Sequence, residues 1–359
     1  PNTPTGNDCD FDSPEPCDDH LSSHGTHTMG IMVGAEGSSD QIGMAPGAMW
    51  IGCRNMEQGW GTPASYMECF EFFLAPYPVG GTPAAGDPAL APHVVNNSWS
   101  CPPTEGCDVT SLALLEASVE ALRQAGIMVV VSAGNYGPTC SSVHYPPAIY
   151  SQSTSVGNFN HLTNQIHSSS SRGPVTYGGS TYIKPELSAP GVSINSSTRG
   201  GTYGSLTGTS MAAPHVAGAV ALLLSAAPGY GGHVDAIENL LLSSTEPMTT
   251  TEGCGGDGPD DVPNNTWGWG ILDALNAVQD ATAGSLEGRV RDANTEHPIA
   301  AAEITAVLVP GPAGPTSTTD TNGQYSAALA LSTYDVTVRA EGRPSRAGVR
   351  AALGADQGH

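Results

Sequence analysis

Short apolar runs alternate with helical patterns over about the first 280 of the 359 residues, and this alternation limits the fold more than any other feature. Runs at 48–53, 93–99 and 127–135 are bounded by turn residues, which predicts buried strands, and 153–157 and 186–194 are further candidates. Apolar residues at helical spacing predict helices over 24–33, 65–75, 110–125, 210–227, 233–243 and 271–279. Strands that alternate with helices predict an α/β fold, in which a parallel sheet is flanked by helices and the site lies at the carboxyl ends of the strands.

The pattern changes after about residue 284. Residues 286–340 show no helical period, and short alternating runs are separated by Gly, Pro and Asn, which predicts a small all-β sandwich. We therefore predict a first domain over 1–283 and a β-sandwich over 284–342. Residues 343–359 have too little apolar pattern to place and are predicted to be a tail.

The charge balance is strongly acidic. The chain has 34 acidic and 11 basic residues, a net charge of -23, and Lys184 is its one lysine. Such a surface argues against nucleic acid and anionic membranes as partners. No apolar run is judged to reach the roughly 18 residues of a membrane helix, so no membrane contact is expected. High salt, solubility and cation binding all remain open as reasons for the acidity.

The cysteines indicate an oxidising compartment. There are eight of them, an even number, in an acidic chain, which favours a secreted protein with disulfides. Cys9–Cys17 and Cys101–Cys107 could each close a short loop, and the pairing of the others stays open. Metal binding is the alternative, but the chain contains no CxxC pair.

One serine has the surroundings of a nucleophile. Ser210 follows Gly208 and Thr209 at the start of a predicted helix, where unpaired N–H groups and the helix dipole favour negative charge. The Ser210 N–H would then stabilise the oxyanion of a tetrahedral intermediate. The alternative is a simple helix cap, which explains Ser210 but not the run of small residues around it.

A serine hydroxyl needs a base, and His24 is the candidate. It lies at the start of a helix that Ser23 is expected to cap. One alternative is a histidine with a structural role, and another is a metal site, because His20, His24 and His27 are spaced by four and three residues. No carboxylate or cysteine completes an evident metal set, so we predict no metal ligands here.

Asn135 is the candidate for a second oxyanion donor. It follows the buried strand 127–135, and its side-chain amide could point into a cleft at the strand's end. Taken singly, an Asn in a turn is the better interpretation, because Asn tolerates the left-handed conformation.

Three motifs in order resemble those of the subtilisin-like serine proteases (subtilases), more narrowly the bacillopeptidase F type. They are His24-Gly25-Thr26-His27, Ala133-Gly134-Asn135 and the eleven-residue run 208–218 (GTSMAAPHVAG), and the resemblance covers about residues 18–280. It implies that His24 is the general base, Ser210 the nucleophile and Asn135 the oxyanion donor, and that His27 is structural.

The same resemblance implies two substrate-binding segments. Ser98, Trp99 and Ser100 match the edge strand that pairs with the substrate backbone. Ala133 and Gly134 match a wall of the pocket for the residue before the scissile bond.

The third member of the triad is not found. The family carries an Asp in an Asp-x-Gly motif at the end of the first core strand, and none of the aspartates among the 23 residues before His24 lies in that context. We expect the strand and its Asp to be supplied by an upstream segment of the same precursor. This chain alone is then expected to be nearly inactive and poorly folded, because the Asp orients the imidazole.

The segment from Leu286 onward resembles carboxypeptidase regulatory-like domains. Four stretches carry the likeness: 286–290 (LEGRV), 298–299 (PI), 319–325 (TDTNGQY) and 334–338 (YDVTV). Such modules serve as spacers or binding units, and none of their residues suggests catalysis.

The expected function is that of a secreted serine endopeptidase, which cleaves polypeptide substrates through an acyl-enzyme and requires no cofactor. The alternatives are a catalytically impaired pseudoprotease that acts as a binding scaffold, and an extracellular adhesion module centred on the sandwich. Calcium is a possible structural ion, because the loop 253–261 (GCGGDGPDD) offers oxygen ligands. A solvated acidic loop is the favoured interpretation of that segment.

Overall fold

The computed structural model describes residues 17–18, 22–35, 37, 41–292, 295–308, 313–330, 333–340 and 346–352. The chain forms two compact units, residues 1–277 and 278–359. The division falls inside the last helix, whereas the sequence placed the boundary just after it, between 283 and 284.

A mostly parallel sheet lies at the centre of the first unit. The parallel strands run in the order β3 (Val94–Asn97), β4 (Met128–Ser132), β5 (Thr154–Asn160) and β9 (Leu187–Pro190), and the short β6 (Gln165–Ile166) pairs antiparallel with β5. Every residue of β4 is buried, as expected of a strand that is covered on both faces. The predicted parallel sheet with flanking helices is confirmed.

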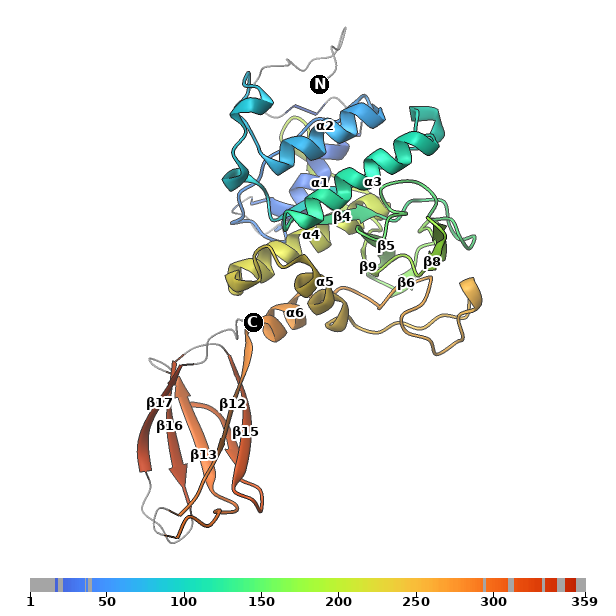
Figure 1. Ribbon diagram of the computed structural model, residues 1–359. Coiled ribbons are helices and arrows are strands. Elements are labelled where there is room, and N and C mark those ends of the chain that lie inside the picture. Colours follow the sequence, from blue (N-terminus) through green and yellow to red (C-terminus); the bar gives the residue numbers. More distant parts are fainter. Residues whose placement is uncertain are drawn as a thin grey trace. The chain divides into compact units, whose positions relative to one another are not determined.

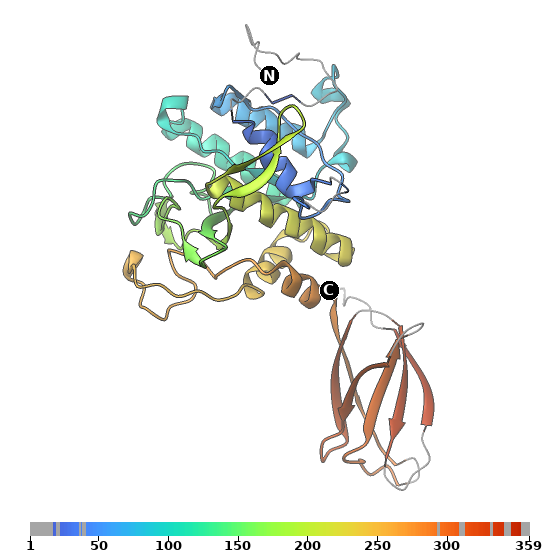
Figure 2. The same cartoon turned by 180° about the vertical axis from the view of Figure 1, so that it is seen from behind.

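Helices cover both faces of this sheet. α2 (Pro63–Leu74) and α3 (Val109–Gln124) lie on one face, which is nearest the viewer in Figure 1. α1 (His24–Val33) and α4 (Thr209–Ala226) lie on the other face, which Figure 2 presents to the viewer. α5 (Val234–Ser243) and α6 (Ala274–Thr282) follow along the chain. α2 and α3 begin at capping boxes formed by Thr62 with Ser65 and by Asp108 with Ser111.

α4 requires a correction to the sequence analysis. It is 18 residues long with a mean hydropathy of 1.4, so by length and composition alone it could cross a membrane. Within the structure 61% of it is buried, and it packs on α1 and on β3, β4, β5 and β9. A helix that is apolar all round is equally the mark of a core helix, and α4 has that position here.

The segment 48–53 does not form the predicted strand. It has no regular structure, and Met49, Trp50 and Ile51 are 99%, 44% and 42% exposed. A strand needs a neighbour to pair its N–H and C=O groups, and no described strand lies beside this segment. The prediction of a buried strand over 48–53 is therefore wrong for the structure as described, in which no described strand pairs with this segment.

The remaining elements of the first unit are short. Three antiparallel hairpins are formed by β1 (Met56–Glu57) with β2 (Trp60–Gly61), β7 (Val175–Tyr177) with β8 (Ser180–Tyr182), and β10 (Ile194–Thr198) with β11 (Thr202–Leu206). Single 3-10 turns are η1 (Pro83–Ala85), η2 (Pro88–Leu90), η3 (Pro103–Glu105), η4 (Pro228–Tyr230) and η5 (Cys254–Gly256).

Disulfides hold several of the loops. Cys101–Cys107 is formed as predicted, and Cys53–Cys69 and Cys140–Cys254 settle two pairs that the sequence left open. Cys17 is disulfide-bonded, and the predicted partner Cys9 lies outside the described residues. Cys140–Cys254 encloses the longest loop of the three, with a sequence separation of 114.

The second unit is made of antiparallel strands. β14 (Ala313–Thr318), β13 (Glu303–Leu308), β16 (Thr333–Arg339) and β17 (Arg346–Ala352) form one sheet in that order, and β12 (Ala283–Arg289) pairs with β15 (Gln324–Ala330). Its described core includes Ala302, Ile304, Ala306 and Val336.

β17 shows that the predicted tail was wrong for residues 346–352. This segment pairs antiparallel with β16 at the edge of the sheet. An edge strand is held by backbone hydrogen bonds along one side, so it can form without the apolar alternation on which the sequence argument relied.

A buried ion pair joins two strands of the central sheet. Lys184, with 0% exposed surface, lies 2.6 Å from a Glu186 oxygen and donates to the Ser153 carbonyl at 2.7 Å. The other Glu186 oxygen accepts hydrogen bonds from the N–H and hydroxyl of Ser155. The pair therefore ties the approach to β9 to the start of β5.

We expect Lys184→Met to lower the free energy of unfolding by about 3 kcal/mol, because it leaves the Glu186 carboxylate without its counter-ion in the core. Urea unfolding followed by circular dichroism would measure the change. In the double variant Lys184→Met/Glu186→Gln, the neutral amide oxygen still accepts from Ser155, and part of the loss should be recovered. Equal destabilisation of the single and double variants would contradict this account.

Candidate active site

Ser210 lies in the first turn of α4, where backbone N–H groups have no partner within the helix. No acceptor for the Ser210 N–H occurs among the described residues. The Ser210 hydroxyl donates to the Ser98 carbonyl at 3.3 Å, and the Ser98 hydroxyl donates to the Ser210 carbonyl at 2.8 Å. Because these N–H groups and the helix dipole favour negative charge, the start of α4 can accept a developing oxyanion.

The Asn135 side chain is fixed by the start of the same helix. Its Oδ1 accepts the Thr209 N–H at 2.9 Å and the Thr209 hydroxyl at 3.2 Å, and that hydroxyl accepts the Gly134 N–H at 3.2 Å. Since the amide oxygen faces the helix, the NH₂ group points away from Thr209. Its hydrogens find no acceptor among the described residues, so they are available to an anion beside Ser210.

His24 is the first residue of α1, and the β10–β11 hairpin holds this helix. The Ser196 and Ser197 hydroxyls donate to the carbonyls of His27 and Thr26 at 2.8 and 3.0 Å. Gly30 permits the close approach, because a Cβ there would lie 2.4 Å from the Ser196 hydroxyl. In the yellow-green part of Figure 2 the hairpin lies against α1.

The cap of α1 differs from the prediction. Ser23 has a left-handed conformation with φ 55° and makes no side-chain cap; its hydroxyl instead accepts the Arg199 N–H at 3.2 Å. Asp18 takes the capping role, since its Oδ2 accepts both the N–H and the hydroxyl of Thr26 at 2.7 Å. A carboxylate at this end also opposes the positive end of the helix dipole.

α1 and α4 pack against each other. Ile31, in the last turn of α1, and Met211, in the first turn of α4, share a buried cluster with Ile194 of β10. The hydrogen bond from Thr209 brings Asn135 to the start of α4 beside Ser210, and His24 lies on the helix that packs on α4.

Two further histidines lie on these helices: His27 is buried and His215 is half-buried. The His27 Nε2 contacts the carbonyls of Ile194 and Gly204, each at 3.0 Å, and the His215 Nδ1 contacts the Met211 carbonyl at 2.8 Å. Burial lowers the pKa of His27 and lowers the pKa of His215 to about 4, so both rings are neutral near pH 7.

The alternative metal site would include His20, which lies outside the described residues, whereas His27 has a structural contact. The contacts of His27 are with backbone carbonyls, which are acceptors, so its Nε2 carries a proton and acts as a structural donor.

The predicted substrate-binding residues form two segments, 98–100 and 133–134. Ser98 and Ser100 follow the end of β3 and are not part of a described strand pair. The Trp99 ring stacks on the Tyr66 ring, with centroids 3.9 Å apart, and faces the core. Trp99 therefore leaves only its backbone for pairing. Ala133 is buried and donates its N–H to the Val156 carbonyl, which holds it in the sheet.

Gly134 packs closely against Ser171 and Tyr136, contacts that sequence reasoning did not describe. Its φ is +104°, and a Cβ there would lie 2.9 Å from the Ser171 hydroxyl and 3.1 Å from the Tyr136 ring. Tyr136 is 45% exposed and packs on the rings of His144 and Tyr145, with centroids 4.7 and 5.3 Å away. Tyr136 follows Asn135 directly and could have been noticed, but the other partners are distant in the sequence.

The proposed calcium loop uses its carboxylates internally. Asp257 accepts the N–H and side-chain amide of Asn265, and Asp261 accepts the Gly258 N–H at 2.7 Å. These carboxylate oxygens therefore already accept hydrogen bonds from amide groups nearby in the sequence. The contacts provide no argument for a calcium ion, and a solvated acidic loop stays the favoured interpretation.

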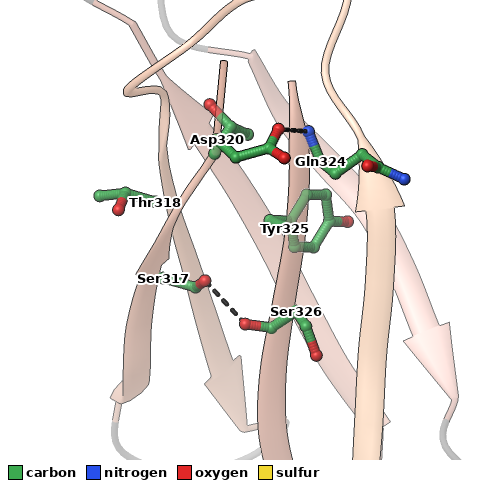
Figure 3. Close-up of a pocket in the computed structure, with 7 residues that line it drawn as sticks. Ser317, Thr318, Asp320, Gln324, Tyr325 and Ser326 are labelled. Carbon is green, nitrogen blue, oxygen red and sulfur yellow. Dashed lines mark hydrogen bonds between the residues drawn. The ribbon is translucent and has the colours of Figure 1, made fainter. Parts of the chain in front are cut away.

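The second unit contains a hollow of its own, shown in Figure 3. It is lined by Ser317, Thr318, Thr319, Asp320, Gln324, Tyr325 and Ser326. The Ser317 hydroxyl donates to the Ser326 carbonyl, and the Asp320 carboxylate accepts the Gln324 N–H, each at 2.8 Å. None of its lining side chains is an imidazole, so it lacks the base that a serine nucleophile needs.

Comparison with known proteins agrees with this geometry. Residues 3–270 match the subtilase family, and residues 285–358 match the carboxypeptidase regulatory-like domain. Bacillopeptidase F of Bacillus subtilis (strain 168) is 39% identical over 275 residues, which are 75% of this chain and 18% of that protein. Subtilisin E of the same strain is 34% identical over 211 residues, which are 58% of this chain and 47% of that protein. The chain thus spans less than half the length of either relative.

Solved structures share the fold. The prenylagaramide maturation protease PagA has a TM-score of 0.54 at 24% identity, covering 73% of this chain and 84% of that one. A protease of Pseudoalteromonas arctica PAMC 21717 has a TM-score of 0.55 at 24% identity, covering 72% and 70%.

We expect the free energy of unfolding to fall as the pH falls from about 6.5 toward 4. The pKa values of His27 and His215 are lowered in the folded state, so in this range the unfolded chain binds more protons and is favoured. Urea unfolding at a series of pH values would measure the slope. His215→Gln should show a shallower slope than the parent, and identical slopes would show that His215 does not contribute.

Proposed function

From the premise that this chain belongs to the subtilase family of serine-type peptidases, we propose that it is the catalytic part of a secreted endopeptidase, one that cleaves internal peptide bonds through an acyl-enzyme. Three disulfides among the described residues support export to an oxidising compartment. The carboxypeptidase regulatory-like domain would serve as a spacer or binding unit.

The mechanism follows from the roles of three residues. His24 takes the proton of the Ser210 hydroxyl, which attacks the peptide carbonyl. The Asn135 NH₂ and the Ser210 N–H hold the oxyanion. His24 then protonates the leaving amine, and water releases the acyl group from Ser210. No step requires a cofactor.

One observation carries this proposal: the acceptor side of the Asn135 amide is bound by Thr209, one residue before Ser210. A hydrogen bond from a backbone N–H can be accepted only by the amide oxygen, so the orientation of the amide is determined. The Asn135 NH₂ is then not used by Thr209, and we propose that it and the Ser210 N–H both donate to the oxyanion.

An upstream segment is proposed to complete the triad with an Asp. Among the described strands, β3 pairs only with β4, so its other edge has unpaired backbone groups. The apolar side chains of Met49, Trp50 and Ile51 are exposed, although their pattern is that of a buried strand. A further strand that pairs with β3 and covers these side chains would satisfy both features, and its Asp would orient the His24 ring.

We expect Asn135→Ala to lower kcat by about 10²–10³-fold with little effect on KM, because one donor to the oxyanion is lost. Peptide hydrolysis under steady-state conditions would measure this. Asn135→Asp is the matched control, since it keeps the acceptor for Thr209 but loses the donor, and it should lose kcat to a similar extent. A variant Asn135→Asp with the parent's kcat would exclude the oxyanion role.

The role of the upstream segment can be tested with a fluorophosphonate probe. We expect the chain extended by the preceding part of its precursor to be labelled at Ser210 about 10⁴-fold faster than residues 1–359 alone, because the Asp orients and stabilises the imidazole. Ser210→Ala should abolish labelling in both. Equal labelling would mean that the chain already contains its carboxylate, and absence of labelling in both would favour the binding-scaffold alternative.

A further inference from the structure

A cavity of about 470 Å³ opens beside the first turn of α1. Cys17, Asp18 and Thr26 line one side, and residues 198–201, at the tip of the β10–β11 hairpin, line the other. The hairpin tip is bound to the approach to His24, since the Arg199 N–H donates to the Ser23 hydroxyl at 3.2 Å. The cavity is therefore adjacent to the residue that we propose as the general base.

Arg199 is the cation of this cavity, and it is exposed. Its guanidinium donates from Nη1 to the Asp18 carbonyl at 3.1 Å, and within the described part of the chain it forms no ion pair with a carboxylate. Arg123, Arg172 and Lys184 differ, because each lies 2.6 Å from a carboxylate oxygen. Most of the five N–H donors of the Arg199 guanidinium thus remain for a ligand.

The acidic group in the cavity does not neutralise this cation directly. Asp18 is the one acidic residue among those that line the cavity, and its Oδ2 is held by the Thr26 N–H and hydroxyl at the start of α1. The positive end of the helix dipole lies at the same place. The Asp18 carboxylate therefore binds the start of the helix, and its carbonyl oxygen accepts from Arg199.

The surrounding charge makes this arrangement unusual. With a net charge of -23, the surface as a whole repels carboxylates. The exposed guanidinium in this cavity is a local source of positive charge, and its planar fork matches a carboxylate with two hydrogen bonds. Thr198 and the turn glycines Gly200 and Gly201 leave the space around it open.

We propose that Arg199 forms a subsite that binds a carboxylate of the peptide substrate. The carboxylate belongs either to an acidic side chain near the scissile bond or to the C-terminus of a short peptide. The inference rests on the proposed peptidase function, because it assigns a preference to the substrate of that site. The guanidinium is the binding group, and the Asp18 carbonyl holds it in the cavity.

Binding to the Ser210→Ala variant of the chain extended by its upstream segment tests this without turnover. Fluorescence-labelled octapeptides would carry Gln or Glu at one position at a time, with a C-terminal amide, and a second set would have a free C-terminal carboxylate. We expect one Glu position, or the free carboxylate, to strengthen binding by about three- to fivefold at low salt, as for an exposed ion pair. The gain should decline in 0.5 M NaCl.

The decisive comparison is the ratio of affinities for the Glu and Gln peptides. Arg199→Gln should remove the gain, whereas Arg291→Gln, an exposed arginine of the second unit, should keep it. A gain that persists in Arg199→Gln, or no gain at any position or terminus, would overturn the proposed subsite. Failure of the extended chain with intact Ser210 to cleave any of the peptides would instead count against the proposed function, so the two failures are distinguishable.

Discussion

The hydrogen bond from the Thr209 N–H to the Asn135 side chain links the two parts of the site. A helix start needs acceptors for its first N–H groups, which a Ser, Thr, Asp or Asn at the N-cap usually supplies. Here the N-cap is Gly208, which has no side chain, and a Cβ there would lie 3.3 Å from the Asn135 amide. The end of β4 therefore supplies the missing acceptor, and stabilising the helix also fixes the orientation of the oxyanion donor.

The parts of the fold that could be predicted are those whose signal is local. β4 is a run of apolar residues buried on both faces, and α3 has apolar residues at helical spacing with a cap at Asp108, so each is determined by its own segment. The errors concern segments in which pairing with a neighbouring strand determines whether a strand forms. Residues 48–53 have a strand's composition but no described neighbour, and 346–352 have a weak pattern but a neighbour in β16.

The same division applies to the site. His24, Asn135 and Ser210 were selected from motifs within a few residues of each, together with a family resemblance. The residues that hold these three side chains in place could not be predicted, because their contacts cross long stretches of chain. Thr209 is 74 residues from Asn135, and Ser196, whose hydroxyl holds α1, is 169 residues from its acceptor His27. The cap of α1 was assigned to the adjacent Ser23 for that reason, whereas the structure uses Asp18. Sequence spacing carries no information about such contacts until the fold is known.

The few cations of the first unit show how an acidic chain allots positive charge. Lys184 and Arg172 are almost wholly buried, and each neutralises one carboxylate that the fold places beside it. A buried pair of this kind contributes little net stability, but removing one partner leaves a charge that the interior cannot solvate. These cations are thus committed to structure, whereas Arg199 is exposed beside α1 and meets no carboxylate among the described residues. In a chain with a net charge of -23, an exposed guanidinium provides a local attraction for anions, and this is why we propose it as the subsite for a substrate carboxylate.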